Sequence, residues 1–341
     1  MTAPLRVMPS FFRHRYNVQL YDPLRGRVEL VRFPRKLPFD DPDFLTGLRA
    51  AQIFHMHWPE LLLGHDPAKH ARLIGHLCEQ GIPIVWTQHN LLPHRADPAW
   101  SAIYQLWAHA ALGVIHHSHW GMERALDVRP YRADAIHRVI PHGHWGGLIE
   151  PSGPYDREQL ARDYGLEPCR THLGILGAPR VSKDVGLVID GFLASGRDDF
   201  DLAIFSLGPD DRFPEHPRIR SLPYQEVSRA EYNRRLALID VLVLPFRRDA
   251  QMLTTGLVGD VIGASKAALI SDWPYLIEIL GETAIVYGDD SAGFAATLAT
   301  LEPAAIERSA QLSGELRDTY PWERSAEETW LLLKDVLASG R

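Results

Sequence analysis

Residues 66–90 read DPAKHARLIGHLCEQGIPIVWTQHN, and they predict a helix, a stop and a buried strand in succession. Leu73, Ile74 and Leu77 recur at helical spacing, and Gly81 is a good residue for ending a helix. The apolar run IPIVW that follows is typical of a buried strand. Because a further strand, AAQIFHMHW, precedes the helix, strand and helix alternate here as in a parallel α/β sheet.

The same alternation extends through both halves of the chain. Further strands are expected in LRVMPS, VELVRF, LGVIHHS, HRVIPHGHW, THLGILGA, DLAIFSLG, DVLVLPF, AALISD and TAIVYGD. Further helices are expected in WSAIYQLWAHAA, SHWGMERALDV, YDREQLARDYGL, KDVGLVIDGFLASG, SRAEYNRRLALI and at the start of TTGLVGDVIGAS, and a helical tail, broken at Pro321, is expected from Ala304 to Ser339. The pattern predicts two doubly wound, Rossmann-like α/β domains, in which ligands bind beyond the carboxyl ends of the strands.

The length of 341 residues exceeds what one hydrophobic core usually supports. We expect an N-terminal domain over 1–150, a second domain over 151–320 and a final helical segment over 321–341. The Pro/Gly-rich stretch 141–154 is the predicted linker. No apolar run of transmembrane length, no signal peptide and only two, widely separated cysteines are present, so we expect a cytoplasmic protein.

Positive charge gathers at the N-terminus. The whole chain carries −7, yet residues 1–40 hold eight basic and three acidic residues. Phe11, Phe12 and Tyr16 lie among the first of the basic residues. This composition predicts a surface for anionic lipid headgroups or a phosphate-bearing acceptor, with peripheral membrane contact. An ordinary solvated face is the alternative. We expect no nucleic-acid partner.

Histidines follow four predicted strands of the first half, in IFHMHWPE, VWTQHNLLPH, VIHHSHW and VIPHGHWGG. Because these loops leave one edge of a parallel sheet, they should line one wall of a cleft. His55 and His57 project to the same side of a strand and could chelate zinc, with His89 or His119 as a third ligand. No recognised zinc-ligand spacing is present, so we expect no bound metal. His55, His116 and His117 are then expected to brace loop carbonyls.

Two stretches in the second half predict anion binding at helix starts. Arg180 and Lys183 follow a strand where a helix begins, and Thr254, Thr255 and Gly256 offer hydroxyls and close backbone approach at another. Two such places in one domain suggest a diphosphate. The alternative for Arg180 and Lys183 is a surface pair. Neither GxxxxGK[ST] nor GxGxxG after the first strand is present.

Together these features resemble the GT-B glycosyltransferases. HMHWPE, TQHNLLPH, IPHGHW and the Arg180/Lys183 segment are similar to motifs of the xanthan-type bacterial β-mannosyltransferases. The likeness spans about residues 50–275, and the tail YPWERSAEETWLLLKDVL resembles the helix that crosses back to the first domain in that fold. The resemblance implies two Rossmann-like domains facing a cleft.

The resemblance also implies an activity and its residues. The donor would be a nucleoside-diphosphate sugar, with GDP-mannose one candidate, and no cofactor or metal would be needed. Arg180 and Lys183 would neutralise the diphosphate. Thr254, Thr255 and Gly256 would hold phosphate oxygens, and His89 in TQHN would contact the donor sugar. The acceptor would be a glycan, a lipid-linked molecule or a small molecule.

One departure bears on the mechanism. The related retaining enzymes carry two glutamates eight positions apart, but QMLTTGLVGDVIGAS has none. Asp260 falls at the second position and could accept from ribose hydroxyls. We therefore favour inversion, which needs a general base on the acceptor side. Glu60 is the first candidate and His57 the second. Rival interpretations are an inactive nucleotide-sugar-binding module of the same fold and a zinc hydrolase built on the histidines.

Overall fold

The computed structural model describes residues 3–93, 97–150, 153–208, 211–213, 215–248 and 251–339. Its contacts divide the chain into two compact units. Unit 1 comprises Met1–Gly143, Gln251–Thr254 and Tyr320–Arg341, and unit 2 comprises His144–Ala250 and Thr255–Thr319. Residues 144–150, which we expected in the N-terminal domain, thus group with unit 2. His94 of TQHNLLPH and residues 151–152 of the expected linker lie outside the described residues.

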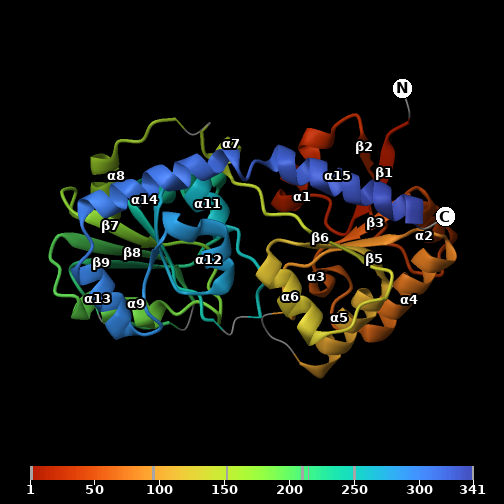
Figure 1. The fold of residues 1–341 in the computed structure, drawn as a ribbon, viewed down its shortest axis with the longest axis horizontal. Helices are drawn as coiled ribbons and strands as arrows, with labels where there is room; N and C mark the ends of the chain where they lie inside the picture. Colours follow the sequence, from red (N-terminus) through yellow and green to blue (C-terminus); the bar gives the residue numbers. More distant parts are fainter. Residues whose placement is uncertain are drawn as a thin grey trace. The chain divides into compact units, whose positions relative to one another are not determined.

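The sheet of unit 1 has six strands in the order β2-β1-β3-β4-β5-β6, all parallel (Figure 1). Strands β3, β4 and β5 are buried along their whole length, as an apolar run in a covered parallel sheet requires. The strands are β1 (Leu5–Pro9), β2 (Val28–Leu30), β3 (Ile53–Met56), β4 (Ile84–Thr87), β5 (Ala111–His116) and β6 (Ile136–Val139).

Helices cover this sheet, and the last of them comes from the far end of the chain. The helices are α1 (Arg15–Tyr21), α2 (Pro42–Arg49), α3 (Pro59–Leu62), α4 (Pro67–Glu79), α5 (Pro98–Ala110), α6 (His119–Val128) and α15 (Trp322–Ser339). Helix α15 packs against α1, β5 and β6. Gly113 of β5 permits this approach, because a Cβ there would lie 2.8 Å from Val336.

The sheet of unit 2 repeats the plan with six parallel strands in the order β12-β11-β10-β7-β8-β9. This is the doubly wound order, which reverses direction between β7 and β10. The strands are β7 (Thr171–Ile175), β8 (Phe200–Leu207), β9 (Ile219–Pro223), β10 (Val241–Leu244), β11 (Ala267–Ile270) and β12 (Ile285–Val286). Both sheets confirm the predicted α/β fold class.

The helices of unit 2 pack on its sheet, with α9 and α13 side by side (Figure 1). They are α7 (Gly146–Ile149), α8 (Arg157–Tyr164), α9 (Val185–Ala194), α10 (Arg229–Leu238), α11 (Leu257–Gly263), α12 (Pro274–Leu280), α13 (Ser291–Ala299) and α14 (Pro303–Glu315). Gly191 allows the α9–α13 contact, since a Cβ there would lie 2.7 Å from the Ser291 carbonyl.

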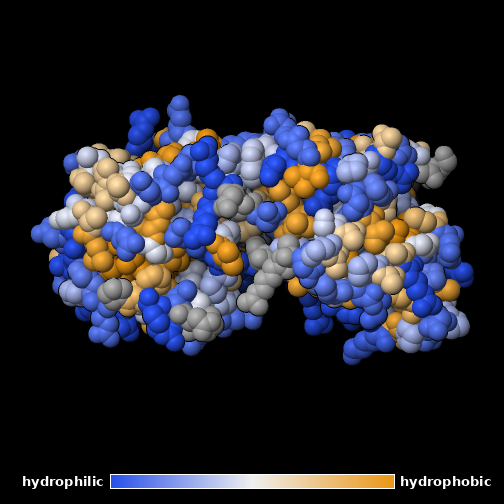
Figure 2. Space-filling view, turned by 90° about the horizontal axis from the view of Figure 1, so that it is seen from below, coloured by the Kyte–Doolittle hydropathy of each residue, from blue (hydrophilic) through white to orange (hydrophobic). Residues whose placement is uncertain are grey.

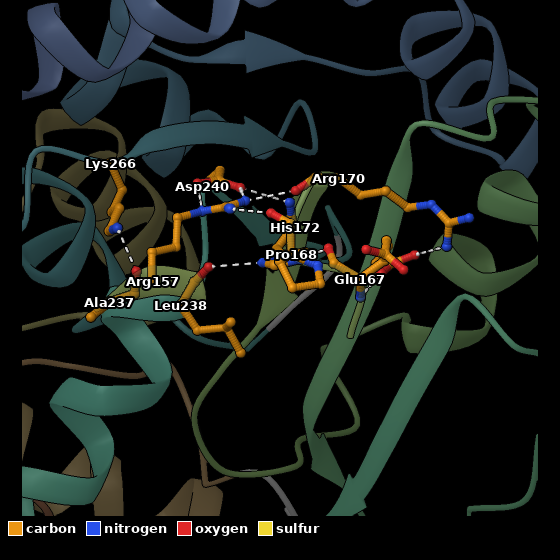
Figure 3. A network of polar contacts seen from close by, with 10 residues as sticks. Arg157, Glu167, Pro168, Arg170, His172, Ala237, Leu238, Asp240 and Lys266 are labelled. Carbon is orange, nitrogen blue, oxygen red and sulfur yellow. Dashed lines mark hydrogen bonds and ion pairs between the residues drawn. The ribbon is translucent and has the colours of Figure 1, made fainter. Parts of the chain in front are cut away.

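A polar network fastens the amino ends of β7 and β10 (Figure 3). The Arg157 guanidinium donates to both carboxylate oxygens of Asp240 and to the carbonyls of Pro168 and Arg170, at 2.5–2.9 Å. Asp240 also accepts from the backbone N–H of His172 at 2.7 Å. Bidentate pairing of this kind is geometrically specific. It fixes the sheet at the edge away from the candidate site.

Several predicted helix boundaries are confirmed by their caps. Ser118 accepts a hydrogen bond from Gly121 N at the start of α6, and Ser228 accepts one from Glu231 N at the start of α10. Gly165 ends α8 with φ 71°, and Gly81 follows α4 with φ 65°. These are conformations that glycine adopts at little cost.

The expected linker is not simply a connecting loop. Residues Gly146–Ile149 form α7 within it, and Trp145 N donates to Gly259 O at 3.0 Å. A Cβ on Gly263 would lie 2.5 Å from Gly146 N. Glycine here serves close backbone packing of α7 on α11, and the boundary between the two units, at Gly143 and His144, falls within this stretch.

In the face drawn in Figure 2, hydrophilic residues predominate and hydrophobic residues appear in separate groups. Val181 and Leu61 are the most exposed of the large hydrophobic side chains, at 73% and 53%. Among the described helices, none is long and apolar enough to cross a membrane.

Candidate functional site

Unit 1 brings four histidines together at the carboxyl ends of β3, β4, β5 and β6. They are His57, His89, His117 and His142, each 7% exposed or less. Ring centroids lie 5.7 Å apart for His57 and His89, 5.1 Å for His89 and His117, and 5.6 Å for His117 and His142. The strand-end loops therefore do converge as the parallel sheet requires.

Tyr16 of α1 is the centre of this histidine cluster. Its ring lies edge-on to all four imidazoles, with centroids at 4.9–5.5 Å. Trp322, at the start of α15, contacts the same ring at 5.2 Å. We expected Tyr16 on a basic, aromatic surface, but its side chain is 3% exposed, and Trp322 was not singled out from the sequence. Tyr16 lies in a seven-residue helix too short for a periodic signal, and Trp322 belongs to the end of the chain.

Burial keeps the histidines of this cluster neutral. It lowers the pKa of His142 to about 3 and that of His117 to about 4, and it lowers the pKa of His57 and His89 well below 6.5. His117 donates from Nδ1 to Ile140 O at 2.8 Å. The Nε2 atoms of His57 and His117 are buried without a hydrogen-bond partner among the described residues.

His55 has a structural role. Its Nδ1 lies 2.5 Å from the Tyr21 hydroxyl and its Nε2 lies 2.8 Å from the Thr87 hydroxyl. His116 likewise bonds His137, at 3.0 Å. The expected bond to a loop carbonyl is thus found for His117, to Ile140 O, whereas His55 and His116 bond side chains instead. Within the described part of the chain, no group of three or more His, Cys, Asp or Glu side chains is placed to hold a metal ion.

Glu60 lies in α3, half-buried. Its Oε2 accepts a hydrogen bond from the Tyr104 hydroxyl of α5 at 2.8 Å. Burial, and then the charge and hydrogen bond of Glu60, hold the pKa of Tyr104 well above 10. The Tyr104 ring in turn lies 5.1 Å from the Arg129 guanidinium. Glu60 thus contacts a phenol on α5, whereas His57 belongs to the cluster around Tyr16.

In unit 2, Lys183 is buried inside the loop that leads from β7 to α9. Its Nζ donates to Leu176 O at 2.6 Å, to Ala178 O at 3.0 Å and to Ser206 Oγ at 3.1 Å. Burial, and then the charge of Arg180, lower the pKa of Lys183 to about 7. Lys183 is therefore a buried amine that shapes the loop from within, and not the surface residue we weighed as an alternative.

Arg180 lies in the same loop and is exposed. Gly177 has φ 83°, and a Cβ there would lie 3.2 Å from Lys183 Nζ. The loop thus bends tightly around the ammonium and leaves the Arg180 side chain at the surface. Helix α9 follows, ten residues long and capped by Asp184, which accepts from Leu187 N at 3.1 Å.

The stretch QMLTTG passes from one unit to the other. Residues Gln251–Thr254 belong to unit 1, where Leu253 N donates to His89 O at 3.0 Å and Leu91 N donates to Gln251 O at 2.7 Å. Thr255 and Gly256 belong to unit 2, where Thr255 Oγ1 accepts from Leu257 N at 3.4 Å. Of the three expected phosphate-binding residues, Thr254 therefore shares unit 1 with His89, whereas Thr255 and Gly256 lie in unit 2.

Asp260 lies in α11 and is 4% exposed. Its Oδ2 accepts from the Tyr232 hydroxyl at 2.6 Å, and its Oδ1 lies 3.8 Å from Arg229 Nη2. The carboxylate expected to receive ribose hydroxyls therefore already contacts two side chains of α10. Neither Tyr232 nor Arg229 was singled out from the sequence, because α10 reads as an ordinary surface helix.

The sequence has a partial match among characterised proteins. No protein-family model matches it. Over 101 residues it is 34% identical to a GDP-mannose:glycolipid 4-beta-D-mannosyltransferase of Xanthomonas campestris pv. campestris. The matched stretch covers 27% of this chain and about a quarter, 26%, of that protein.

Solved structures match along nearly the whole chain. HepE of Anabaena, in complex with UDP and glucose, superposes with a TM-score of 0.72 at 12% identity, covering 97% of this chain and 100% of that one. A glycosyltransferase from Rickettsia africae gives 0.71 at 9% identity, covering 99% of each. The UDP-forming α,α-trehalose-phosphate synthase of Burkholderia vietnamiensis gives 0.67 at 12%, covering 98% and 100%. The fold is that of the GT-B glycosyltransferases, which confirms the resemblance in the sequence.

The buried histidines predict an acid-sensitive protein. In the fold, His55, His117 and His142 stay neutral until the pH approaches 3 or 4, whereas in the unfolded chain a histidine binds its proton near 6.5. Their stabilising contribution is therefore complete above pH 6.5 and is lost as the pH falls toward about 4. Each such histidine should lower the free energy of unfolding by about 2 kcal/mol at pH 5.

Urea unfolding at neutral and at mildly acidic pH measures this loss. His117→Gln should reduce the difference between the two conditions, because one buried titrating group is removed. His109→Gln, which changes an exposed histidine of α5, is the control and should leave the difference unchanged. Equal stability of the wild-type protein at both pH values would contradict the assignment.

Proposed function

We propose that this protein is a glycosyltransferase that moves a hexose from a nucleoside-diphosphate sugar to a glycan, lipid-linked or small-molecule acceptor. The hydrogen bond from Leu253 N to His89 O supports this most directly. Within unit 1 it fixes the backbone of the histidine proposed to contact the donor sugar to the segment that contains Thr254, and the chain continues from there to Thr255 and Gly256, which are also proposed to hold the phosphates. The names of the relatives, which bind UDP or use GDP-mannose, favour a nucleotide-sugar donor.

The diphosphate leaving group would be neutralised by the loop after β7. Arg180, at the surface of that loop, would contact it directly. Lys183 would hold the loop carbonyls in place and add its charge, since a nearby anion raises the pKa of a lysine. Electrostatic stabilisation of the leaving group accounts for most of the rate in this proposal. GDP-mannose is the favoured donor, without a metal or another cofactor.

On the acceptor side, Glu60 is the proposed general base, with His57 as the alternative. Glu60 is half-buried, and the hydrogen bond from the Tyr104 hydroxyl to Oε2 orients its carboxylate. His57 is 1% exposed, which favours a supporting role within the histidine cluster. Asp260, held by Tyr232, is the proposed partner of the ribose hydroxyls. If one carboxylate acts alone as the general base, the sugar is transferred with inversion at the anomeric carbon.

The N-terminal segment is proposed to contact membrane lipids. Two of its arginines have acidic partners, Arg25 with Asp22 and Arg27 with Glu327. The guanidinium groups of Arg32 and Arg35 lie over Phe12 and Phe11, at 5.4 and 4.8 Å. An exposed group of cations on aromatic rings suits an anionic interface, where each is worth about 1 kcal/mol. A protein bound there could reach a lipid-linked acceptor from the cytoplasmic face.

Arg180→Ala should lower sugar transfer by about a hundredfold or more, because the developing charge on the diphosphate loses its nearest donor. Thermal melts with a panel of nucleotide sugars, followed by turnover assays, measure binding and chemistry separately. Arg308→Ala, in an exposed position of α14, is the matched control. Unchanged turnover in the Arg180 variant would refute its role, and binding without turnover in the wild type would favour an inactive module.

Glu60→Gln should lower kcat by about a hundredfold or more while the donor KM stays the same, because only the proton acceptor is removed. Glu79→Gln, an exposed carboxylate at the end of α4, is the control. NMR of the product should give an anomeric configuration opposite to that of the donor. Normal kcat in the Glu60 variant would transfer the role to His57, and a retained configuration would exclude the single-base mechanism.

Vesicle co-sedimentation tests the lipid contact. The protein should bind vesicles rich in phosphatidylglycerol and release them at high salt, since surface charges are screened. The double variant Arg13→Glu and Arg15→Glu should bind several-fold less, whereas Arg308→Glu should bind normally. Equal binding to neutral phosphatidylcholine vesicles would rule out recognition by charge.

A further inference from the structure

A cavity of about 300 Å³ lies in unit 2, at the carboxyl ends of β10, β11 and β12. Phe246 and Tyr287, each 2% exposed, contribute aromatic surface to it. Its polar lining consists of Asp184, Arg247, Arg248, Ser271, Asp272 and Asp289. None of the residues assigned above to the donor or the acceptor lines it, although Lys183 lies beside it, 5.9 Å from the Phe246 ring.

The charged groups of the lining are already paired with one another. Arg247 Nη2 lies 3.2 Å from Asp184 Oδ2. Arg248 Nη1 lies 3.3 Å from Asp272 Oδ2 and 3.7 Å from Asp289 Oδ2. An anionic ligand such as a phosphate would therefore meet three carboxylates and only guanidinium groups that they already engage. The lining thus disfavours a diphosphate.

Asp272 provides the positive reason for a ligand. Its Oδ1 is buried and has no hydrogen-bond partner among the described residues. Burial, and then the hydrogen bond and charge of Asp289, raise the pKa of Asp272, so the two carboxyl groups favour sharing one proton. The side chain as a whole is 31% exposed, so its other oxygen, Oδ2, can accept a hydrogen bond from a ligand hydroxyl.

A neutral, hydroxyl-rich ligand fits these groups best. When Asp272 and Asp289 share a proton, the three carboxyl groups and two guanidinium groups of the lining carry no net charge. The metal ion that a carboxylate group might suggest lacks its ligand set in the described residues. A volume near 300 Å³ is at the small end of ligand pockets, which suits one sugar ring better than a nucleotide.

We propose that this cavity is a second carbohydrate site, which binds one neutral hexopyranose ring. Asp272 and Asp289 accept hydrogen bonds from neighbouring sugar hydroxyls, and Arg248 donates to a third. Phe246 and Tyr287 pack against the apolar carbons of the ring. The site goes beyond the proposed transfer reaction, since it lies on other residues and binding there requires no donor nucleotide.

Saturation-transfer NMR and calorimetry with D-mannose, D-glucose and maltotriose test the site on the full chain. One or more of these sugars should bind at millimolar concentration, and GDP or UDP should not displace it. Asp272→Asn and Asp289→Asn should each weaken binding about tenfold or more, as loss of a hydrogen bond to a charged group does. If maltotriose bound more tightly than the monosaccharides, the ligand would be a glycan chain. If all of these sugars bound equally, the ligand would be a single ring.

Asp198→Asn, an exposed carboxylate of unit 2, is the control and should bind the sugar normally. Thermal melts with GDP and UDP on every variant report the donor site separately, so failure of one assignment is distinguishable from failure of the other. Asp289 is 64% exposed at its side chain, so its variant should fold even where Asp272→Asn does not. The proposal would be overturned if none of the sugars bound, or if a nucleotide displaced the bound sugar. It would also be overturned if the cavity bound a simple anion (phosphate) or a simple cation (ethylammonium) in place of a sugar.

Discussion

In a parallel sheet every strand ends at the same edge, and the loops that follow must share that edge. This constraint accounts for the chemistry of both units. In unit 1 it gathers His57, His89, His117 and His142, which are up to 85 positions apart in sequence, around the ring of Tyr16. In unit 2 it brings the loops after β7, β10, β11 and β12 to one edge, so that the proposed donor-binding loop and the proposed sugar cavity can be neighbours without sharing residues.

Burial of ionisable groups determines the charge at the carboxyl edge of each sheet. The imidazoles in unit 1 are neutral because charging them would remove hydration that the fold does not replace. The Lys183 ammonium in unit 2 is buried as well, but two carbonyls and a hydroxyl surround it. The sheet edge in unit 1 is thus an uncharged, aromatic surface. The sheet edge in unit 2 carries a loop whose shape is held by the buried Lys183. This division suits a reaction in which one side holds an anionic diphosphate.

Much of this fold was readable from local patterns, and much of the site was not. Buried strands such as IPIVW and caps such as Ser118 and Ser228 depend on neighbouring residues, so the sequence predicts them. The Tyr16–Trp322 contact joins the two ends of the chain, and Asp260 with Tyr232 joins two helices. Contacts between residues so far apart leave no periodic pattern in the sequence, so they could not be predicted from it. The boundary between the units falls within the predicted linker 141–154, but the close packing of Gly146 on Gly263 could not be predicted, because glycine permits close packing as readily as it permits freedom.

The composition of unit 1 from three chain segments has a consequence for synthesis. Leu332, Leu333 and Val336 of α15 are fully buried in unit 1, so its core lacks one wall until those residues have left the ribosome. Unit 2 runs from His144 to Thr319 apart from the short excursion Gln251–Thr254. The half of the chain that is made first therefore completes its fold last. Until then the nascent N-terminal sheet exposes an apolar strip, which makes this stage the one at which chaperones and aggregation compete.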